Sequence, residues 1–357
     1  MQVISPKWIY SNNTKLEVDK SILIDGSIII DILDNKTVEK QYKEISRIEY
    51  PNHLLMPTFT ESYLDLNDCG NKKEEEEKIK SLLKYGVTKL CVNTNNYKDI
   101  IYSTIDQIDI ALTIQFDGKT TGQLNIKEMT DVLDFYKSDP SKIFCITLEN
   151  IIHFQKDIIK KLSSIINEID INVHIKGNCL ENISDKKIIK EIISFWTEIN
   201  LIDNSYMHGL LKLNDYWLSS IKKRNVAAIV AYDELRSIDN YMKFYQLLKN
   251  KYKCILVTDS SDTYDLYQSI KLIETIDIDK HNFDKNGIID CVTKNPSELF
   301  SSFIPSGEIK KGNKASFNLF DFSSHQLLKS KISTPKLRFL DKQSLTHVWS
   351  AGKKVKI

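Results

Sequence analysis

The sequence predicts an α/β protein, a (β/α)8 TIM barrel with a small β-sandwich domain formed by both chain termini. Three observations lead to this prediction. Apolar runs alternate with polar stretches of helical pattern between residues 57 and 305, and both ends of the chain are rich in short β-type segments. In addition, a chain of 357 residues exceeds the usual size of one domain and can bury a large core.

The β-type segments at the two ends are expected to form one domain. Residues 21–24 and 27–32 flank the turn pair Asp25-Gly26, which is a hairpin signal. The β-type pattern returns after Pro305, in residues 315–321 and 347–353. We therefore assign residues 1–56 and 306–357 to this β-sandwich domain.

The central segment, residues 57–305, is assigned to the barrel. Its apolar runs, counting one that begins at Met56, are eight: 56–66, 87–92, 110–116, 143–148, 171–175, 206–207, 226–231 and 254–257. Strands of a parallel barrel are buried on both faces and therefore give continuous apolar runs, and eight β/α units in about 250 residues fit this fold. A doubly wound open sheet is the alternative architecture.

Charge and composition argue against two classes of partner. The 49 basic and 48 acidic residues nearly cancel, and no block rich in Lys and Arg appears, so neither nucleic acid nor an anionic membrane is expected. The mixed charge run at residues 72–78 is expected to begin a solvated helix. We expect a soluble, cytoplasmic protein, because no apolar span is long enough to cross a bilayer and no signal-type segment follows Met1.

The six cysteines are scattered, without a Cys-x-x-Cys pair, which argues against a zinc ribbon and against a disulfide framework. Several lie inside apolar runs, where a reduced cysteine behaves as a small core residue.

Several segments together resemble the amidohydrolase superfamily, most closely its cytosine-deaminase and chlorohydrolase-like branch, over nearly the whole chain. Residues 292–300 and 307–317 resemble the family's Thr-x-Asn-Pro-Ala ending and its Gly-x-Ile-x-x-Gly-x-x-Ala-Asp turn, with Ser316 in place of the Asp. Residues 24–29 and 348–355 resemble the family's first hairpin and last strand. Residues 55–66 stand where the family carries Pro-Gly-Phe-Ile-Asp-x-His-x-His-Leu.

The resemblance implies a divalent metal at the carboxyl mouth of the barrel, with Zn, Fe or Mn as the candidates. His174, His208 and Asp259 match the family's ligands on strands 5, 6 and 8. Imidazole and carboxylate together bind such a cation, and the resemblance makes Asp259 the base that takes a proton from water activated by the metal.

The chain departs from the family at the first strand and after the fifth. Tyr63 and Asp65 replace the two histidines of strand 1, although Asp65 remains a competent oxygen ligand. Gly177 stands where the deaminase branch has a Glu that shuttles protons, and Glu181 is not expected to replace it.

Strand periodicity places Lys176 on the same face as His174, two residues earlier. An ammonium at that point would repel a divalent cation. We hypothesise that it neutralises Asp65 and Asp259 instead, since a buried charge needs an opposite charge.

The sequence assigns less specific roles to other polar groups. Asn93, Gln115 and Glu149 stand at or near strand ends and are candidates for lining a pocket or for hydrogen-bonded filling of the barrel. The remaining histidines are expected to be surface or structural residues: His53, His153, His281, His325 and His347.

Two functions are compatible with this pattern. The first is a metal-dependent hydrolase of a non-peptide carbon–nitrogen bond, an amide or amidine of a small molecule, with Asp65, His174, His208 and Asp259 around the cation. The alternative is a catalytically inactive homologue that acts as a binding module or partner subunit. Either form is compatible with a homo-oligomer or with pairing to a related subunit.

Overall fold

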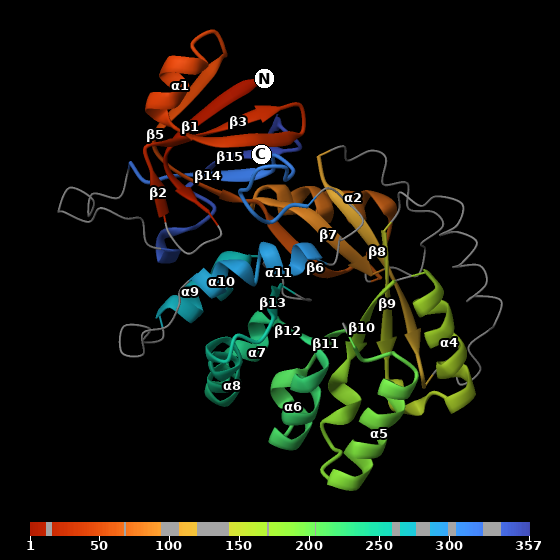
Figure 1. Cartoon of the computed structure of the whole chain (residues 1–357). Helices are drawn as coiled ribbons and strands as arrows, with labels where there is room; N and C mark the ends of the chain where they lie inside the picture. The colour runs from red at the N-terminus through yellow and green to blue at the C-terminus, as the bar shows by residue number, and fades with distance from the viewer. Residues whose placement is uncertain are drawn as a thin grey trace.

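The computed structural model is described here for residues 1–11, 16–67, 69–93, 107–119, 143–169, 171–203, 205–258, 265–275, 286–298, 305–323 and 337–357. Its strands form two separate eight-stranded sheets, and helices lie along the outside of one of them (Figure 1).

The barrel sheet contains eight parallel strands in chain order. They are β6 (Phe59–Asp65), β7 (Val87–Asn93), β8 (Asp109–Asp117), β9 (Ile143–Glu149), β10 (Asn172–Lys176), β11 (Tyr206–His208), β12 (Ala227–Ala231) and β13 (Cys254–Val257). The order runs from β6 to β13 without reversal. A doubly wound sheet requires a switch in strand order, so the barrel prediction is confirmed and the open-sheet alternative is wrong.

Helices follow most of these strands and bury one face against them. The α-helices of this part are α2 (Lys72–Leu83), α4 (Lys156–Ile169), α5 (Lys186–Glu198), α6 (Asp215–Ile221), α7 (Tyr232–Leu235), α8 (Ile238–Lys249), α9 (Leu266–Thr275), α10 (Asn286–Asp290) and α11 (Lys294–Ser297). Short 3-10 turns are η2 (Ile151–His153), η3 (Gly177–Leu180), η4 (Leu210–Lys212), η5 (Lys222–Arg224) and η9 (Leu337–Phe339). The predicted helix at the charge run is α2, and the side chain of Asn71 caps it by accepting from the Lys73 and Glu74 N–H groups.

Small and apolar side chains fill the barrel interior. One buried cluster takes residues from strands all around the sheet: Tyr63, Cys91, Ala111, Cys145, Tyr206, Ala227, Ile229, Ala231, Ile255 and Val257. Because side chains alternate along a strand, the polar residues two positions further along β6, β7, β9 and β11 continue these inward rows toward the carboxyl ends.

A buried carboxylate bridges the seam where the barrel closes. Among the described residues β6 and β13 share no hydrogen-bonded ladder. Glu61 of β6 accepts hydrogen bonds from the Thr258 N–H at 2.9 Å and from the Thr258 hydroxyl at 2.7 Å, just after β13. This side chain is fully buried and therefore ties the first barrel strand to the last.

The second sheet joins both ends of the chain, as predicted. Its strands are β1 (Gln2–Tyr10), β2 (Leu16–Val18), β3 (Lys20–Asp25), β4 (Ile28–Asp34), β5 (Arg47–Pro57), β14 (Phe317–Asp321), β15 (Leu345–Ser350) and β16 (Lys353–Val355), and α1 (Asn35–Gln41) follows β4. The order is β16-β15-β14-β5-β1-β3-β4, with β2 paired to β1. The division into domains at residues 56/57 and 305/306 stays a prediction, since β5 runs through Met56 to Pro57.

This sheet contacts the amino ends of the barrel strands. The Asn318 amide donates to the Gly86 carbonyl at 3.0 Å, immediately before β7, and the Lys314 ammonium lies 2.6 Å from both oxygens of Asp109, the first residue of β8. The carboxyl ends of the barrel strands, where barrel enzymes place their chemistry, lie at the opposite end of those strands.

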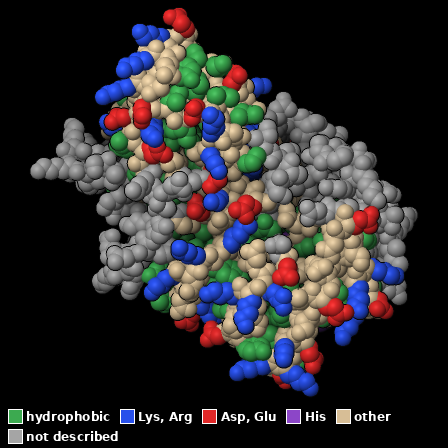
Figure 2. All heavy atoms as spheres, viewed as in Figure 1, with side chains coloured by type: hydrophobic (Ala, Val, Ile, Leu, Met, Phe, Trp, Pro, Cys, Tyr) green, Lys and Arg blue, Asp and Glu red, His purple; other side chains and the backbone are tan. Residues whose placement is uncertain are grey.

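Charges of both signs are interspersed on the face of the molecule seen in Figure 2. In the part of the chain that the structure describes, no helix combines the length and apolar character needed to span a membrane.

Candidate functional site at the carboxyl mouth of the barrel

Strand register brings the described members of the predicted site to the same end of the barrel. Lys176 of β10 is paired with His208 of β11, and His174 is paired with Thr147 of β9. Asp65 of β6 is paired with Asn93 of β7. Paired residues of parallel strands point to the same face, so these side chains converge inside the mouth.

The two residues that replace the strand 1 histidines form a hydrogen-bonded unit. The Tyr63 hydroxyl donates to Asp65 Oδ2 at 3.4 Å, and the Asn93 amide nitrogen lies 3.1 Å from the same oxygen and 3.2 Å from the phenol. Asp65 Oδ1 accepts from the Asn67 N–H at 2.9 Å. Both oxygens of Asp65 are therefore engaged within the protein.

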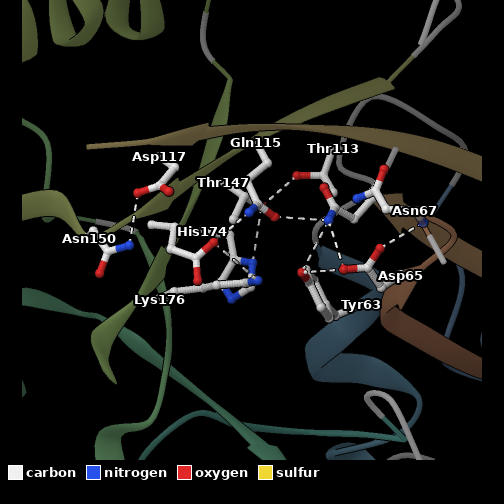
Figure 3. A network of polar contacts seen from close by, with 12 residues as sticks. Tyr63, Asp65, Asn67, Thr113, Gln115, Asp117, Thr147, Asn150, His174 and Lys176 are labelled. Atoms are coloured by element: carbon white, nitrogen blue, oxygen red, sulfur yellow. Dashed lines mark hydrogen bonds and ion pairs between the residues drawn. The ribbon is translucent and has the colours of Figure 1, made fainter. Parts of the chain in front are cut away.

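A chain of amides and carboxylates continues from Asp65 across the mouth (Figure 3). Asn93 donates to Gln115 Oε1 at 2.9 Å, and Gln115 donates to Glu149 Oε2. Glu149 in turn lies 3.8 Å from the ammonium of Lys176. The network links strands β6, β7, β8, β9 and β10. Asn93, Gln115 and Glu149 therefore line the mouth and are also joined to one another by hydrogen bonds.

Lys176 lies inside the mouth, as strand periodicity predicts. Its side chain is 17% exposed, and its ammonium stands over the Tyr63 ring at 5.1 Å from the centroid. Among the described residues its carboxylate partner is Glu149 rather than Asp65, which corrects the hypothesis for Asp65, whereas Asp259, the other carboxylate in that hypothesis, lies outside the described residues. Glu149, on the adjacent strand β9, pairs with it, whereas Asp65 is already held by Asn93 and Tyr63.

His174 has one nitrogen held and one nitrogen without a described partner. Its Nδ1 lies 3.2 Å from the Thr147 hydroxyl, which in turn lies 2.7 Å from the Thr113 hydroxyl. Its Nε2 is buried and has no hydrogen-bond partner in the described structure. Burial, together with the nearby charges of His208 and Lys176, lowers the pKa of His174 well below its usual value, so the ring is neutral at pH 7.

His208 lies beside His174 and contacts a carboxylate that the sequence analysis missed. The two imidazole rings are nearly parallel with centroids 6.1 Å apart, and the Tyr63 ring packs edge-on against both. His208 Nε2 is 3.5 Å from Glu234 Oε2, and both side chains are almost buried. Burial opposes ionisation of Glu234, but contact with His208, the Ala231 N–H and the charge of Lys212 bring its pKa below the usual value.

Comparison with known proteins identifies the family of this chain. The sequence profile of the amidohydrolase family matches residues 79–355, which is more than half of the chain. The chain belongs to the amidohydrolase family. No curated protein matches it by sequence.

Solved structures with the same fold are distant in sequence. An aminofutalosine deaminase of Helicobacter pylori in complex with methylthio-coformycin shares 13% identity over all of both chains, with a TM-score of 0.76. An adenosine deaminase of Xanthomonas campestris with bound zinc shares 13% identity over 99% of this chain and 92% of that chain, with a TM-score of 0.74. A guanine deaminase of C. acetobutylicum with bound guanine shares 13% identity over 99% and 100%, with a TM-score of 0.73.

The fit of this amidohydrolase mouth to a metal ion depends on His174. Within the described residues no group of three or more His, Cys, Asp and Glu side chains is placed to hold a metal, and Asp259 lies outside those residues. A buried imidazole nitrogen without a partner, on a ring held from its other side by a hydroxyl, nevertheless has the arrangement of a metal ligand. The described part of the chain therefore offers His174 Nε2 as one donor for an ion, without a complete set of ligands.

The departure at Gly177 is built into the backbone of this amidohydrolase. A Cβ at this position would lie 2.7 Å from the carbonyl oxygen of His208, so a glutamate cannot stand there without a shift of the backbone. Glu181 pairs with Lys212 at 3.3 Å.

The remaining histidines that the structure describes lie on the terminal sheet or, for His153, at an exposed position. His53 and His347 are neighbours on the terminal sheet, with ring centroids 6.0 Å apart, and His153 ends η2. His281 and His325 fall outside the described residues.

Glu61 and Glu234 are buried or nearly buried acidic residues of the described barrel that the sequence analysis did not identify. Glu61 offered one signal, since it occupies the Asp position of the family phrase two residues before Tyr63. Glu234 lies on a helix rather than a strand and gave no signal of periodicity.

Proposed function

We propose that this amidohydrolase is a metal-dependent hydrolase acting on a non-peptide carbon–nitrogen bond, an amide or amidine, of a small molecule at the carboxyl mouth of the barrel. The observation that carries the proposal is the buried, unpartnered Nε2 of His174, next to His208 and within the family fold. A site that had lost its function would gain nothing by leaving a buried polar atom without a partner, since such an atom costs stability.

One divalent ion would be held by His174, with His208, Asp65 and Asp259 as the further ligands that the family pattern implies. Such an ion supplies Lewis acidity toward water and toward the group being hydrolysed. Zn, Fe and Mn are the candidates. The Xanthomonas campestris adenosine deaminase contains zinc, which supports zinc first.

The protein's own residues then have separate roles. Asp259, directly after Thr258, accepts the proton of the attacking water. Glu61 holds Thr258 by two hydrogen bonds and so fixes the chain that leads to Asp259. Tyr63 and Lys176 line the substrate space, and the Lys176 ammonium offers donors to an electron-rich group of the substrate.

Metal content tests the proposal without requiring a known substrate. The full chain is purified without chelator, reconstituted with Zn, Fe or Mn, and analysed for bound metal. We expect about one ion per chain, lost in His174→Ala and retained in the matched control His153→Ala. Absence of metal after reconstitution in all three cases would contradict the proposal and favour the inactive homologue.

Activity is tested by ammonia release from a panel of amino-substituted heterocycles and small amides. Guanine and adenosine are the first members, because similar folds include deaminases named for them. Turnover that disappears in Asp259→Asn supports the hydrolase. A metal-loaded protein that turns over no member of a broad panel but binds one of them would support the binding module.

A cytoplasmic location and a homo-oligomeric or paired state remain predictions. Fractionation of cells and light scattering of the purified chain would test them.

A further inference from the structure

Two buried threonines and His174 form a row across three neighbouring strands of the barrel (Figure 3). Thr113 lies on β8, Thr147 on β9 and His174 on β10, and none of the three is more than 3% exposed. The two threonine hydroxyls are 2.7 Å apart, and that of Thr147 is 3.2 Å from His174 Nδ1. Each of the three is followed two residues later, on the same face of its strand, by a member of the polar network of the mouth. The row therefore lies one layer below that network.

The hydrogen bonds of the row have a preferred direction, because a hydroxyl has one hydrogen to donate. Among the described residues the Thr113 hydroxyl contacts only that of Thr147. If Thr113 donates to Thr147, the Thr147 hydrogen goes to His174 Nδ1, and both hydrogens are bonded. In the reverse direction Nδ1–H donates to Thr147 and Thr147 donates to Thr113, whose own hydrogen then lacks an acceptor in the described part of the barrel. Since an unbonded hydroxyl in a dry interior costs stability, the first direction is favoured.

This direction determines where a neutral His174 carries its proton. A ring nitrogen that accepts a hydrogen bond keeps its lone pair, so Nδ1 is unprotonated and the proton lies on Nε2. Nε2 is buried and has no hydrogen-bond partner in the described structure. In this state the ring offers an N–H at Nε2, whereas a metal ion needs the lone pair of that nitrogen.

We propose that Thr147 is the positioning residue of His174 and that its hydrogen bond reverses when an ion binds. Without an ion, the Thr147 hydroxyl donates to Nδ1 and keeps the proton on Nε2. When Nε2 binds an ion, its proton passes to water and Nδ1 takes up another, so the ring stays neutral and Thr147 accepts from Nδ1–H. The state without an ion stands on geometry alone, whereas the reversal rests on the proposed function.

Nitrogen-15 NMR of the full chain labelled at histidine tests the state without an ion. Metal is removed with a chelator, the chelator is then removed, and the spectra are recorded at a pH at which the ring is neutral. The His174 signals are assigned by their loss in His174→Ala. We expect the wild-type ring to be protonated at Nε2. Thr147→Val should give a mixture of the two tautomers, and Thr147→Ser, which keeps the hydroxyl, should restore the wild-type spectrum.

Thr113→Val is the matched control. It makes the same change at an equally buried threonine of the next strand and leaves Thr147 able to donate to Nδ1, so His174 should stay protonated at Nε2. If Thr147→Val does not fold, Thr147→Ala replaces it. A wild-type ring protonated at Nδ1 would overturn the proposal without any variant. An unchanged tautomer after loss of the Thr147 hydroxyl would overturn it as well.

Zinc titration separates the reversal from the proposed function. On addition of zinc to the wild type, the proton of His174 should move from Nε2 to Nδ1. Zinc affinity, measured by competition with a chromophoric chelator, should fall about 10–100-fold in Thr147→Val, because Nδ1–H loses its acceptor. Zinc binding that leaves the proton on Nε2 would overturn the reversal. Failure of the wild type to bind zinc, with Nε2 protonated as expected, would reject the hydrolase and the reversal together and still support the placement of the proton by Thr147.

Discussion

Glu61 is a buried carboxylate that links the first and last strands of the barrel by hydrogen bonds. Besides the two bonds from Thr258, it accepts from the Tyr63 N–H at 3.1 Å, and it has no exposed surface. A carboxylate in such a place is tolerated only because several donors surround it.

Replacement of Glu61 is expected to destabilise the fold. In Glu61→Ala the two donors of Thr258 and the Tyr63 N–H lose their acceptor in a dry environment, so the free energy of unfolding should fall by about 2–5 kcal/mol. Urea denaturation measures the change. Glu77→Ala, at an exposed pair with Lys73, is the control and should change stability by less than about 1 kcal/mol. Equal effects of the two variants would contradict the role given to Glu61.

Lys89 gives the molecule a predictable dependence on pH. This lysine of β7 is 3% exposed, and burial lowers its pKa from 10.5 to about 8. Between pH 8 and 10.5 the unfolded chain therefore binds more protons at this residue than the folded chain, and stability contributed by Lys89 rises with pH over that window. The penalty below pH 8 is about 3 kcal/mol.

The variant Lys89→Met removes the titrating group and should remove the penalty. We expect its melting temperature at pH 7 to exceed that of the wild type, with a difference that shrinks as the pH approaches 10.5. Differential scanning calorimetry at several pH values checks this. A constant difference across the range would show that Lys89 is not titrating as stated.

At the scale of elements, the sequence predicts the strands well because their chemistry is local. Each barrel strand matches an apolar run, and period-two alternation correctly places Lys176 inside the mouth on the same face as His174. The hairpin at Asp25-Gly26 and the helix at the charge run are confirmed for the same reason. Such signals need no knowledge of distant residues.

Features that depend on distant or non-periodic contacts could not be predicted. The carboxylate of Glu234 reaches His208 through a helix cap, and the partner of Lys176 is decided by which strand stands next to β10. The apparent last strand at residues 347–353 is two strands, since Ala351 and Gly352 turn with positive φ between β15 and β16. The continuous sequence pattern concealed this turn.

Gly352 provides a test of the packing between two turns. Its φ is +76°, and a Cβ there would lie 1.8 Å from the carbonyl oxygen of Gly26, in the turn between β3 and β4. Gly312 has a similar φ of +85°, but a Cβ there meets nothing within 4 Å. The two glycines thus share the backbone requirement and differ in the close approach.

We expect Gly312→Ala to cost about 1 kcal/mol of unfolding free energy, the conformational term alone. Gly352→Ala should cost about 1–3 kcal/mol more, because the two turns must move apart. Parallel urea titrations give the difference. Similar values for both variants would mean that the contact between the turns adds nothing.

At the scale of the whole molecule, charge is buried at both ends of the barrel in different ways. The carboxyl mouth contains the ion pair of Lys176 with Glu149 and the contact of His208 with Glu234. The amino end contains the pair of Lys314 and Asp109, which joins the terminal sheet to β8 and is mostly buried. The first group surrounds a candidate ligand space, whereas the second connects two sheets.

The pair at the amino end also controls the titration of Lys89. Asp109 stabilises the charged form of Lys89 and raises its pKa, whereas the ammonium of Lys314 lowers it. In Lys314→Met the pKa of Lys89 should therefore rise, and the window in which stability increases with pH should begin above about pH 8. In Asp109→Asn the same window should begin at a lower pH. Lys311→Met, at an exposed lysine 3.8 Å from Asp31, is the control and should leave the window in place. Calorimetric melts of the three variants from pH 7 to 11 measure the position of this window. The prediction requires that Lys314→Met and Asp109→Asn shift it in opposite directions. A general loss of stability would lower the melting temperature of both variants without moving the pH at which their stability begins to rise.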